Sequence, residues 1–374
     1  MTPRSTDFPA PPTARRALAS RAILAAVLAI IGLPILEGVA SAGVLVSDVM
    51  RLEPPVQNFR QAAYDSLLGW VSLPNLALRD NFGPGIALTT NADGIRVHRP
   101  ISATLAPGER RVLCSGASFT FGSGVADGDT FCARLEERLP GVRTLNLAQR
   151  GYGIDQSYLL YRRDGGRYPH HVQLFAMNSS DLDRSASTTM TGYPKPVLSL
   201  ADGKVTAENV PVPEWSGWSR WSDGRTLLPN LRLVQLVLRR VDNDEAAQMR
   251  RVDLQMWPLL DSVFTDLARL NRAHGSVPVI VYLPALQEYA AGPRDDRRVK
   301  FAASAKRAGI AFIDLTPDLR TVSPDSLDWL FITPNALPVR GASGHLTVSG
   351  HQWVADRISA HLRRDSAAAA ALGL

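Results

Sequence analysis

The sequence predicts an α/β fold, in which helices cover both faces of a parallel sheet in three layers and an apolar N-terminal segment precedes the domain. Three observations predict it. Short apolar runs rich in β-branched residues alternate with stretches of helical periodicity. A hydrophobic content of 45% in a chain of 374 residues can fill a sizeable core. A long apolar stretch follows a short N-terminal segment that is rich in arginine and proline.

The N-terminal segment predicts a cytoplasmic tail over residues 1–20 and a transmembrane signal-anchor over residues 21–47. Arginines before the apolar stretch predict that this end stays in the cytoplasm and that the rest is exported. The alternative is a cleaved signal peptide with its small-residue site at residues 40–42. We favour the anchor because hydrophobicity resumes beyond that site. The expected location is the bacterial inner membrane with the main domain in the periplasm, or secretion after cleavage.

The body of the chain predicts a membrane-proximal segment over residues 48–108 and a main domain over residues 109–366. The first is rich in proline and predicts short strands and loops. In the second, five apolar runs predict strands that are buried on both faces. They are residues 110–115, 142–147, 172–177, 277–283 and 310–315. Helices between them predict parallel pairing with right-handed crossovers.

Three stretches of the main domain have helical periodicity. The first follows Asp127 and Asp129, which we expect to cap it, and the second should end at Gly275. The stretches are marked by Phe131, Leu135 and Leu139, by residues 254–274, and by Val354, Ile358 and Leu362.

Residues 184–250 interrupt the alternation and predict an insertion. Trp215, Trp218 and Trp221 follow one another there at three-residue spacing. Such side chains either stack on sugar rings, rest at a membrane interface or form the core of a lid. We favour the core, because aromatic residues more often serve burial.

Composition argues against several classes of protein. The net charge of +6 is scattered over the chain without a basic run, so we expect no nucleic-acid partner. Cys114 and Cys132 are too few for a disulfide scaffold or a cysteine metal site. They either pair in an oxidising compartment or are two small buried hydrophobic residues, which we favour. The histidines suggest no metal site, since His170 and His171 are expected in a loop and His351 on the surface of a helix.

Ser118 is the first residue with a predicted chemical role. It stands directly after the predicted strand 110–115, behind a glycine, where a helix begins. Ligands bind at the carboxyl ends of parallel strands, and N–H groups at a helix start stabilise an oxyanion. Glycine and serine also occur in such turns for backbone freedom and capping alone, so the short motif by itself is a weak signal.

Four sequence blocks together resemble the SGNH hydrolases, the GDSL-like lipase and esterase family. GASFTFGSGV at residues 116–125 resembles the first block, and NLAQRGYG at residues 146–153 the second. FAMN at residues 175–178 resembles the third, and HLT at residues 345–347 the last. TNADGIR at residues 90–96 resembles a motif that precedes the hydrolase core in membrane-anchored members. The similarity covers about residues 85–362 and implies a flavodoxin-like SGNH-hydrolase fold.

The resemblance implies acyl-transfer chemistry. Ser118 would be the nucleophile and His345 the general base. The backbone N–H groups of Ser118 and Gly151 and the Asn178 amide would form the oxyanion hole. No cofactor and no metal are implied. The expected protein is a serine esterase or O-acyltransferase that acts on a small ester or an acylated glycan, with acetyl groups of an envelope or extracellular glycan favoured.

The chain departs from the family pattern at two places. Ala117 replaces the aspartate before the nucleophile, and Ala342 and Ser343 stand where the acid of the triad is expected. A backbone carbonyl, or a distant carboxylate such as Asp314 or Asp328, would then have to orient His345. The alternative is a catalytically impaired glycan-binding or assembly protein. We favour the enzyme because four role-matched residues occur together. The oligomeric state is left open.

Overall fold

The computed structural model describes residues 14–50, 61–191, 193–214, 245–290, 294–334, 336–338 and 341–374. The chain divides into two compact units, the first of which contains the N-terminal helix. The second contains the described residues 61–214 and 246–374. Trp215, Trp218 and Trp221 of the predicted insertion lie outside the described residues.

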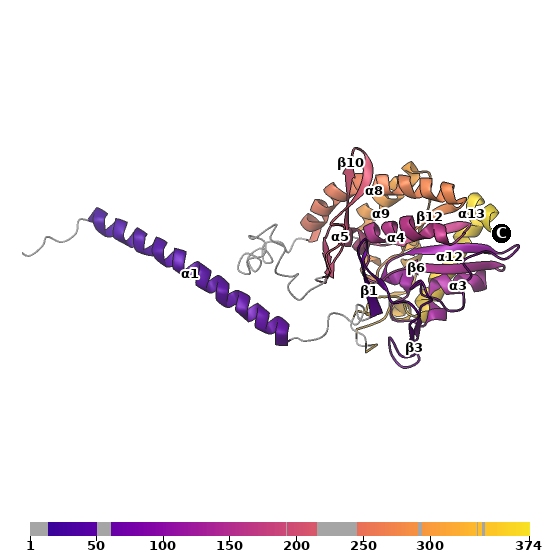
Figure 1. The fold of residues 1–374 in the computed structure, drawn as a ribbon, viewed down its shortest axis with the longest axis horizontal. Coiled ribbons are helices and arrows are strands. Elements are labelled where there is room, and N and C mark those ends of the chain that lie inside the picture. The colour runs from indigo at the N-terminus through magenta and orange to yellow at the C-terminus, as the bar shows by residue number, and fades with distance from the viewer. Residues whose placement is uncertain are drawn as a thin grey trace, which may run out of the picture. The chain divides into compact units, whose positions relative to one another are not determined.

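The N-terminal helix α1 is a single helix from Ala14 to Met50 (Figure 1). Its central part, Ala19–Gly43, has 25 residues and a mean hydropathy of 2.4. At about 1.5 Å per residue this length exceeds the ~30 Å hydrocarbon thickness of a bilayer. The helix is therefore long and apolar enough to cross a membrane.

The second unit is built on a parallel sheet of five strands in the order β13-β12-β7-β5-β6. The chain enters the sheet at β5, continues to β6 on one side, and then crosses to β7 on the other side. Such a reversal places the loops that follow the strands around one crevice. The strands are β5 (Arg110–Gly116), β6 (Val142–Ala148), β7 (Val172–Met177), β12 (Val277–Tyr282) and β13 (Ala311–Asp314).

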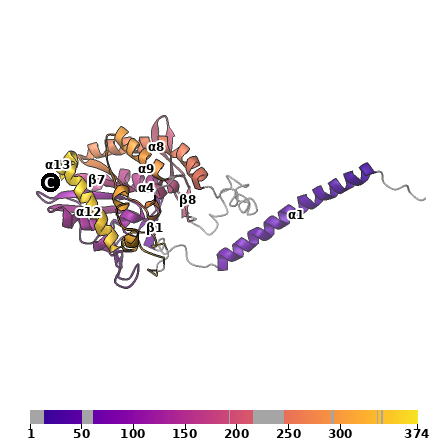
Figure 2. The ribbon, with the colours of Figure 1, turned by 180° about the vertical axis from the view of Figure 1, so that it is seen from behind.

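Helices cover both faces of this sheet, which gives the three layers that the sequence predicts. Alternate strand residues point to opposite faces, so that Leu113 and Phe175 join one hydrophobic core and Val112 and Leu174 the other. Helices α4 (Ile154–Asp164), α8 (Glu245–His274) and α9 (Arg294–Arg307) form the first core with the sheet. Helices α3 (Phe131–Arg138), α12 (Val348–Arg364) and α13 (Ser366–Leu372) form the second, and Figure 2 shows α12 and α13 in yellow.

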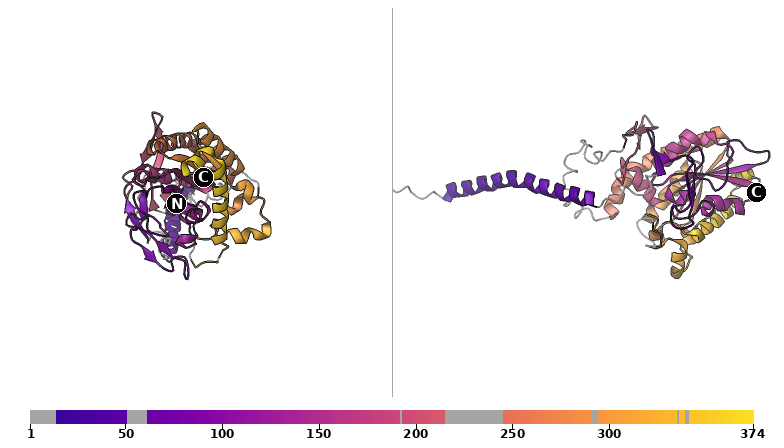
Figure 3. Two further views of the ribbon diagram at one scale, coloured as in Figure 1. Left: turned by 90° about the vertical axis from the view of Figure 1, so that its right-hand side faces the viewer. Right: turned by 60° about the horizontal axis from the view of Figure 1, so that its bottom comes forward.

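Short elements fill the connections of the second unit. The remaining helices are α2 (Ser118–Phe121), α5 (Ser179–Ser185), α10 (Thr316–Leu319) and α11 (Leu327–Leu330), with single 3-10 turns at Asp127–Asp129, Gly165–Arg167, Leu286–Glu288 and Pro324–Ser326. The antiparallel pairs are β1 (Ala62–Asp65) with β2 (Gly69–Ser72), β3 (Ala77–Leu78) with β4 (Leu88–Thr89), β8 (Thr189–Met190) with β9 (Tyr193–Pro194), and β10 (Val197–Ala201) with β11 (Lys204–Glu208). The chain ends just after α13, at the C-terminus marked in Figure 3.

Some local predictions were wrong. The side chain that caps α3 is Thr130, whose Oγ1 accepts from Ala133 N at 3.2 Å, rather than Asp127 or Asp129. The long helix α8 begins at Glu245 and not at Leu254.

The favoured interpretation of the two cysteines is confirmed. Cys114 and Cys132 are both buried and unpaired.

His351 was expected on the surface and is instead buried, with 1% of its surface exposed. Its Nδ1 accepts a hydrogen bond from Phe131 N at 3.1 Å, at the start of α3. A buried imidazole with a backbone donor is stable in its neutral form, so this residue joins α12 to α3.

Candidate active site

Ser118 is the first residue of α2 and follows the carboxyl end of β5. Ala117 begins the helical turn, and its carbonyl accepts from Phe121 N at 2.8 Å. The preceding Gly116 is required by close packing, because a Cβ there would come within 2.6 Å of the Ala176 carbonyl oxygen. The strand-to-helix turn therefore lies tightly against the neighbouring strand β7 and presents the serine at the edge of the sheet.

The hydroxyl of Ser118 meets the imidazole of His345, although 227 positions separate the two residues in sequence. The distance from Ser118 Oγ to His345 Nε2 is 2.8 Å, which is hydrogen-bonding distance. The ring of Phe119 lies beside the imidazole, with 4.8 Å between the ring centres. A nucleophile and its base need this contact for proton transfer.

A backbone carbonyl holds the other nitrogen of His345. Its Nδ1 lies 3.2 Å from the carbonyl oxygen of Ala342, which also accepts from His345 N at 3.1 Å. An oxygen acceptor at Nδ1 favours the tautomer with the proton there and leaves Nε2 free to accept from Ser118. Neither of the carboxylates considered from the sequence occupies this position. Asp314 instead bonds to Arg298 and accepts from Thr316 N at 2.9 Å.

The loop that carries His345 is fixed by backbone hydrogen bonds. Ile332 N donates to His345 O at 2.7 Å, and Gly344 N donates to Ile332 O at 2.8 Å. Directly after the loop, Thr347 N donates to Leu330 O at 2.9 Å, and the Thr347 hydroxyl caps α12 through Gly350 N. His345 thus lies in a turn that backbone hydrogen bonds to Leu330 and Ile332 hold in place, shortly before α12.

The environment of His345 keeps its imidazole neutral. Burial, together with the positive charges of Arg150 and Arg184, lowers the pKa of His345 to about 4. The hydrogen bond to the Ala342 carbonyl acts in the opposite direction but is outweighed. At neutral pH the ring is therefore in the form that can accept a proton.

Asn178 follows the carboxyl end of β7 and caps α5. Its Oδ1 accepts from Asp181 N at 3.2 Å, and its own N–H donates to Asp181 Oδ2 at 3.0 Å. This reciprocal capping fixes the side-chain amide. Within the described part of the chain, the Asn178 Nδ2 group makes no hydrogen bond and is left able to donate to a ligand.

Gly151 lies in the turn after β6, with a φ of +77° that favours glycine. The residues around it are tied to the asparagine loop by Arg184 of α5. The Arg184 Nε group donates to Tyr152 O at 2.8 Å, and the same guanidinium bonds to Asp181. The loops that follow β6 and β7 are therefore braced by one side chain.

Trp70 of β2 holds the same turn from the other side, and no motif in the sequence singled it out. Its indole Nε1 donates to Arg150 O at 3.0 Å, directly before Gly151. Tyr152 Oη donates back to Trp70 O at 2.5 Å. The two bonds enclose Gly151 between fixed neighbours. The separation of some 80 residues between the partners explains why local sequence patterns could not reveal the contact.

Arg96, the last residue of the upstream motif, fixes the segment that follows the serine helix. It is buried, and its guanidinium donates to Phe121 O, Gly122 O and Val125 O, each at 2.7 Å. Its Nε also pairs with Asp127 at 2.8 Å. The motif thus supports the segment after Ser118 through these hydrogen bonds of Arg96.

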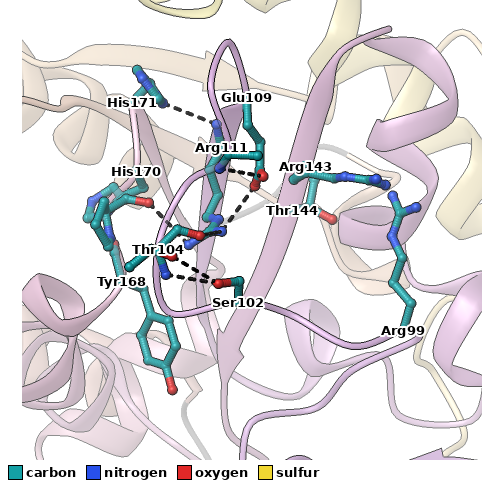
Figure 4. Close-up of polar contacts among 12 residues, drawn as sticks. Arg99, Ser102, Thr104, Glu109, Arg111, Arg143, Thr144, Tyr168, His170 and His171 are labelled. Atoms are coloured by element: carbon teal, nitrogen blue, oxygen red, sulfur yellow. Dashed lines mark hydrogen bonds and ion pairs between the residues drawn. The ribbon is translucent and has the colours of Figure 1, made fainter.

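A second polar cluster lies at the opposite edge of the sheet, where the strands begin (Figure 4). His171 Nδ1 accepts from Arg111 N at 3.1 Å, and Arg111 Nη2 donates to Glu109 at 3.0 Å. His170 Nδ1 bonds to Tyr168 O at 2.7 Å. These contacts satisfy the polar groups of loops, and no three His, Cys, Asp or Glu side chains in the described ranges are grouped to hold a metal ion.

A hollow of about 940 Å³ also opens at this opposite edge. Arginines 99 and 143 line it together with Glu136, and both of them pair with that carboxylate. Because these charges compensate one another, we assign no ligand to this hollow.

Comparisons with known proteins give only remote likenesses. No protein-family model and no curated protein matches the chain. Similar solved structures include the acetyl xylan esterase AlAXEase, at 12% identity over 67% of this chain and 98% of that one, with a TM-score of 0.38. TesA is similar at 11% identity over 68% and 99% of the two chains, with a TM-score of 0.36. A protein named as lipolytic and of the G-D-S-L family, from Desulfitobacterium hafniense DCB-2, is similar at 11% identity over 67% and 99%, with a TM-score of 0.36. Likeness at this level carries no information on chemistry, which has to come from the residues of the site.

Proposed function

We propose that this chain is a serine esterase or O-acyltransferase that works through an acyl-Ser118 intermediate. The observation that supports it is the 2.8 Å contact between Ser118 Oγ and His345 Nε2, with His345 Nδ1 turned to the Ala342 carbonyl. Serine hydroxyls are weak nucleophiles until a base removes their proton. This pair supplies both groups in the tautomer that the reaction needs.

In the acylation step, Ser118 Oγ bonds to the carbonyl carbon of the ester while its proton passes to His345 Nε2. The electrons of the carbonyl double bond move onto its oxygen. The N–H groups of Ser118 and Gly151 and the Asn178 Nδ2 group are the donors proposed for this oxyanion, and one such donor contributes about 3 to 4 kcal/mol. The intermediate then expels the alkoxide, which takes the proton from Nε2.

In the second half of the reaction, a hydroxyl group attacks the acyl-serine. His345 Nε2 takes the proton of this acceptor and returns it to Ser118 Oγ as the acyl group leaves. Water as the acceptor gives an esterase, whereas a sugar hydroxyl gives an O-acyltransferase. Negative charge that develops on the substrate oxygen favours the imidazolium and so offsets the low pKa of the resting His345.

The proposed substrate is an acetylated glycan, or a small ester, outside the cytoplasm. The proposed location is supported by α1, which has the length and hydropathy of a membrane anchor, with arginines at its N-terminal end. We propose that α1 stays in the inner membrane of a bacterium and that the enzyme domain acts in the periplasm. Signal cleavage would instead release the domain.

The test uses the full chain in detergent with p-nitrophenyl acetate and a fluorophosphonate probe. We expect Ser118→Ala to abolish labelling and to lower turnover by at least about 10³-fold, and His345→Gln to have a similar effect on turnover. Ser123→Ala is the matched control, since Ser123 follows the same short helix and its buried hydroxyl has no hydrogen-bond partner among the described residues.

Retained labelling in Ser118→Ala, or wild-type protein without turnover, would contradict the proposal. If the inactive wild type still bound glycans as tightly as Ser118→Ala does, the chain would be a binding protein on a hydrolase scaffold. The comparison of glycan binding is necessary because, among the described residues, His345 Nδ1 meets the Ala342 carbonyl and not a carboxylate.

A further inference from the structure

Arg150 brings a positive charge to the candidate site. The residue directly precedes Gly151, and 8% of its surface is exposed. Its charge is among those that lower the pKa of His345, so the guanidinium lies within electrostatic reach of the imidazole. Burial, helped by the charge of Arg96, lowers the pKa of Arg150 itself to about 9.

Arg150 differs from the other buried cations in having no carboxylate partner. Within the described ranges, every other buried arginine or lysine has a carboxylate oxygen no more than 3.0 Å away. These pairs are Arg96 with Asp127, Arg111 with Glu109, Lys195 with Asp155, and Arg297 with Asp183 and Asp253. Arg184, the other cation near His345, is also paired, with Asp181.

The contacts that Arg150 does make are neutral. Its guanidinium carbon lies 4.8 Å from the ring centre of Phe82 and 6.0 Å from that of Phe121. Its Nη1 lies 3.4 Å from Gln61 Oε1, a long hydrogen bond, and its buried Nε has no hydrogen-bond partner among the described residues. Aromatic faces stabilise a cation only in part. A buried cation without a counter-charge is costly and is stabilised when an anionic group comes beside it.

We propose that Arg150 binds an anionic group of the substrate, a carboxylate or a phosphate, beside the site of acyl transfer. The proposal rests on the proposed function, since it names the class of ester that the same site accepts. A guanidinium binds either anion through two parallel hydrogen bonds. In a glycan these groups belong to uronic acids or to phosphorylated sugars, so the acyl group would be carried by, or transferred to, an acidic sugar.

The first test compares acetate release from three acetylated sugars that differ at one carbon: glucuronic acid, glucose 6-phosphate and the neutral glucuronamide. With the full chain in detergent, we expect kcat/KM for an anionic sugar to exceed that for the amide by about ten- to hundredfold, mainly through KM. The preferred sugar tells a carboxylate from a phosphate. Equal values for all three would overturn the proposal and leave the esterase function standing.

Variants of Arg150 then test whether this residue causes the preference for an anionic sugar. Arg150→Gln should bring the ratio of kcat/KM between the anionic and the neutral sugar to about one, and Arg150→Lys should keep part of it. Arg184→Gln is the matched control, because Arg184 is also near His345 but already has a carboxylate. It should keep the ratio whatever happens to turnover. A ratio that persists in Arg150→Gln, with or without a lower Tm, would overturn the proposal.

Binding of the three sugars to the Ser118→Ala variant tests this inference independently of the proposed function, because the measurement needs no catalysis. Calorimetric titration with the same three sugars needs no turnover and no change at Arg150. Tighter binding of an anionic sugar than of the amide supports the inference, even in a protein that releases no acetate. Equal binding of all three sugars would count against it in the same way as equal turnover.

Discussion

In the proposed mechanism, His345 is oriented by a neutral acceptor where serine hydrolases with a triad have a carboxylate. The Ala342 carbonyl fixes the orientation of the ring, but it carries no full charge to stabilise an imidazolium. Burial and two nearby arginines disfavour the charged ring further. In the proposed mechanism His345 therefore starts as a neutral base, and the negative charge of the substrate oxyanion would stabilise the imidazolium that forms.

The pH dependence of activity should reveal this neutral histidine. With p-nitrophenyl acetate, kcat/KM should fall on acidification with a midpoint near pH 4, because protonated His345 cannot take the proton of Ser118. An unperturbed histidine would give a midpoint near ~6.5. Arg150→Gln removes a charge that lowers this pKa and should raise the midpoint, whereas Arg150→Lys should not. A wild-type midpoint near the ordinary histidine value would contradict the assignment of His345.

At the scale of elements, the turn after β6 is held from two directions. Trp70 of β2 bonds to the residue before Gly151 and receives a bond from Tyr152, the residue after it. Arg184 of α5 bonds to Tyr152 as well. An oxyanion donor is effective only when its N–H is fixed before the reaction begins. The proline-rich segment before the sheet therefore supports the turn that carries Gly151, the proposed oxyanion donor.

Trp70→Phe tests this support, since it keeps the aromatic ring and removes the indole N–H. We expect kcat for p-nitrophenyl acetate to fall by about tenfold with KM nearly unchanged, because a loosened donor affects the transition state more than the ground state. Trp353→Phe is the control, as the Trp353 N–H has no hydrogen-bond partner in the described ranges. Equal kcat in the two variants, or a loss confined to KM, would show that Trp70 does not position the turn.

The sequence predicted the elements better than the contacts between them. The five sheet strands lie within one or two residues of their predicted bounds, because strands buried on both faces are continuous apolar runs. The pairs β1–β2 and β10–β11 were not resolved individually, since short strands at the surface lack such runs. The blocks around Ser118 and His345 marked candidate residues, whose roles stay predictions. Trp70 escaped notice, because its contacts span some 80 residues of sequence. A backbone carbonyl was one of the groups considered for orienting His345, but the sequence could not single out that of Ala342.

At the scale of the whole molecule, buried neutral histidines recur in the second unit, and two of them, His345 and His351, bond to residues more than 200 positions away. Burial is the main cause that lowers the pKa of His170 to about 4, of His345 to about 4 and of His351 to about 3. The folded chain therefore takes up these protons only in strong acid, whereas the unfolded chain binds them near pH ~6.5. The free energy that these neutral histidines contribute to folding is fully present above about pH 6.5. It is lost as the pH falls toward their pKa values in the folded chain.

His351→Asn isolates one of these histidines. An asparagine Oδ1 can replace Nδ1 as the acceptor for Phe131 N–H but does not titrate, so the variant should lose about 2 kcal/mol less stability than wild type between about pH 7 and about pH 5. His351→Gln moves the acceptor one bond further and should be less stable at every pH, with the same reduced pH dependence as the asparagine variant. Urea unfolding of the full chain in detergent measures both. If the free energy of unfolding of wild type and His351→Asn changed with pH in the same way, His351 would not be held neutral. The contact between α12 and α3 would then survive protonation of His351.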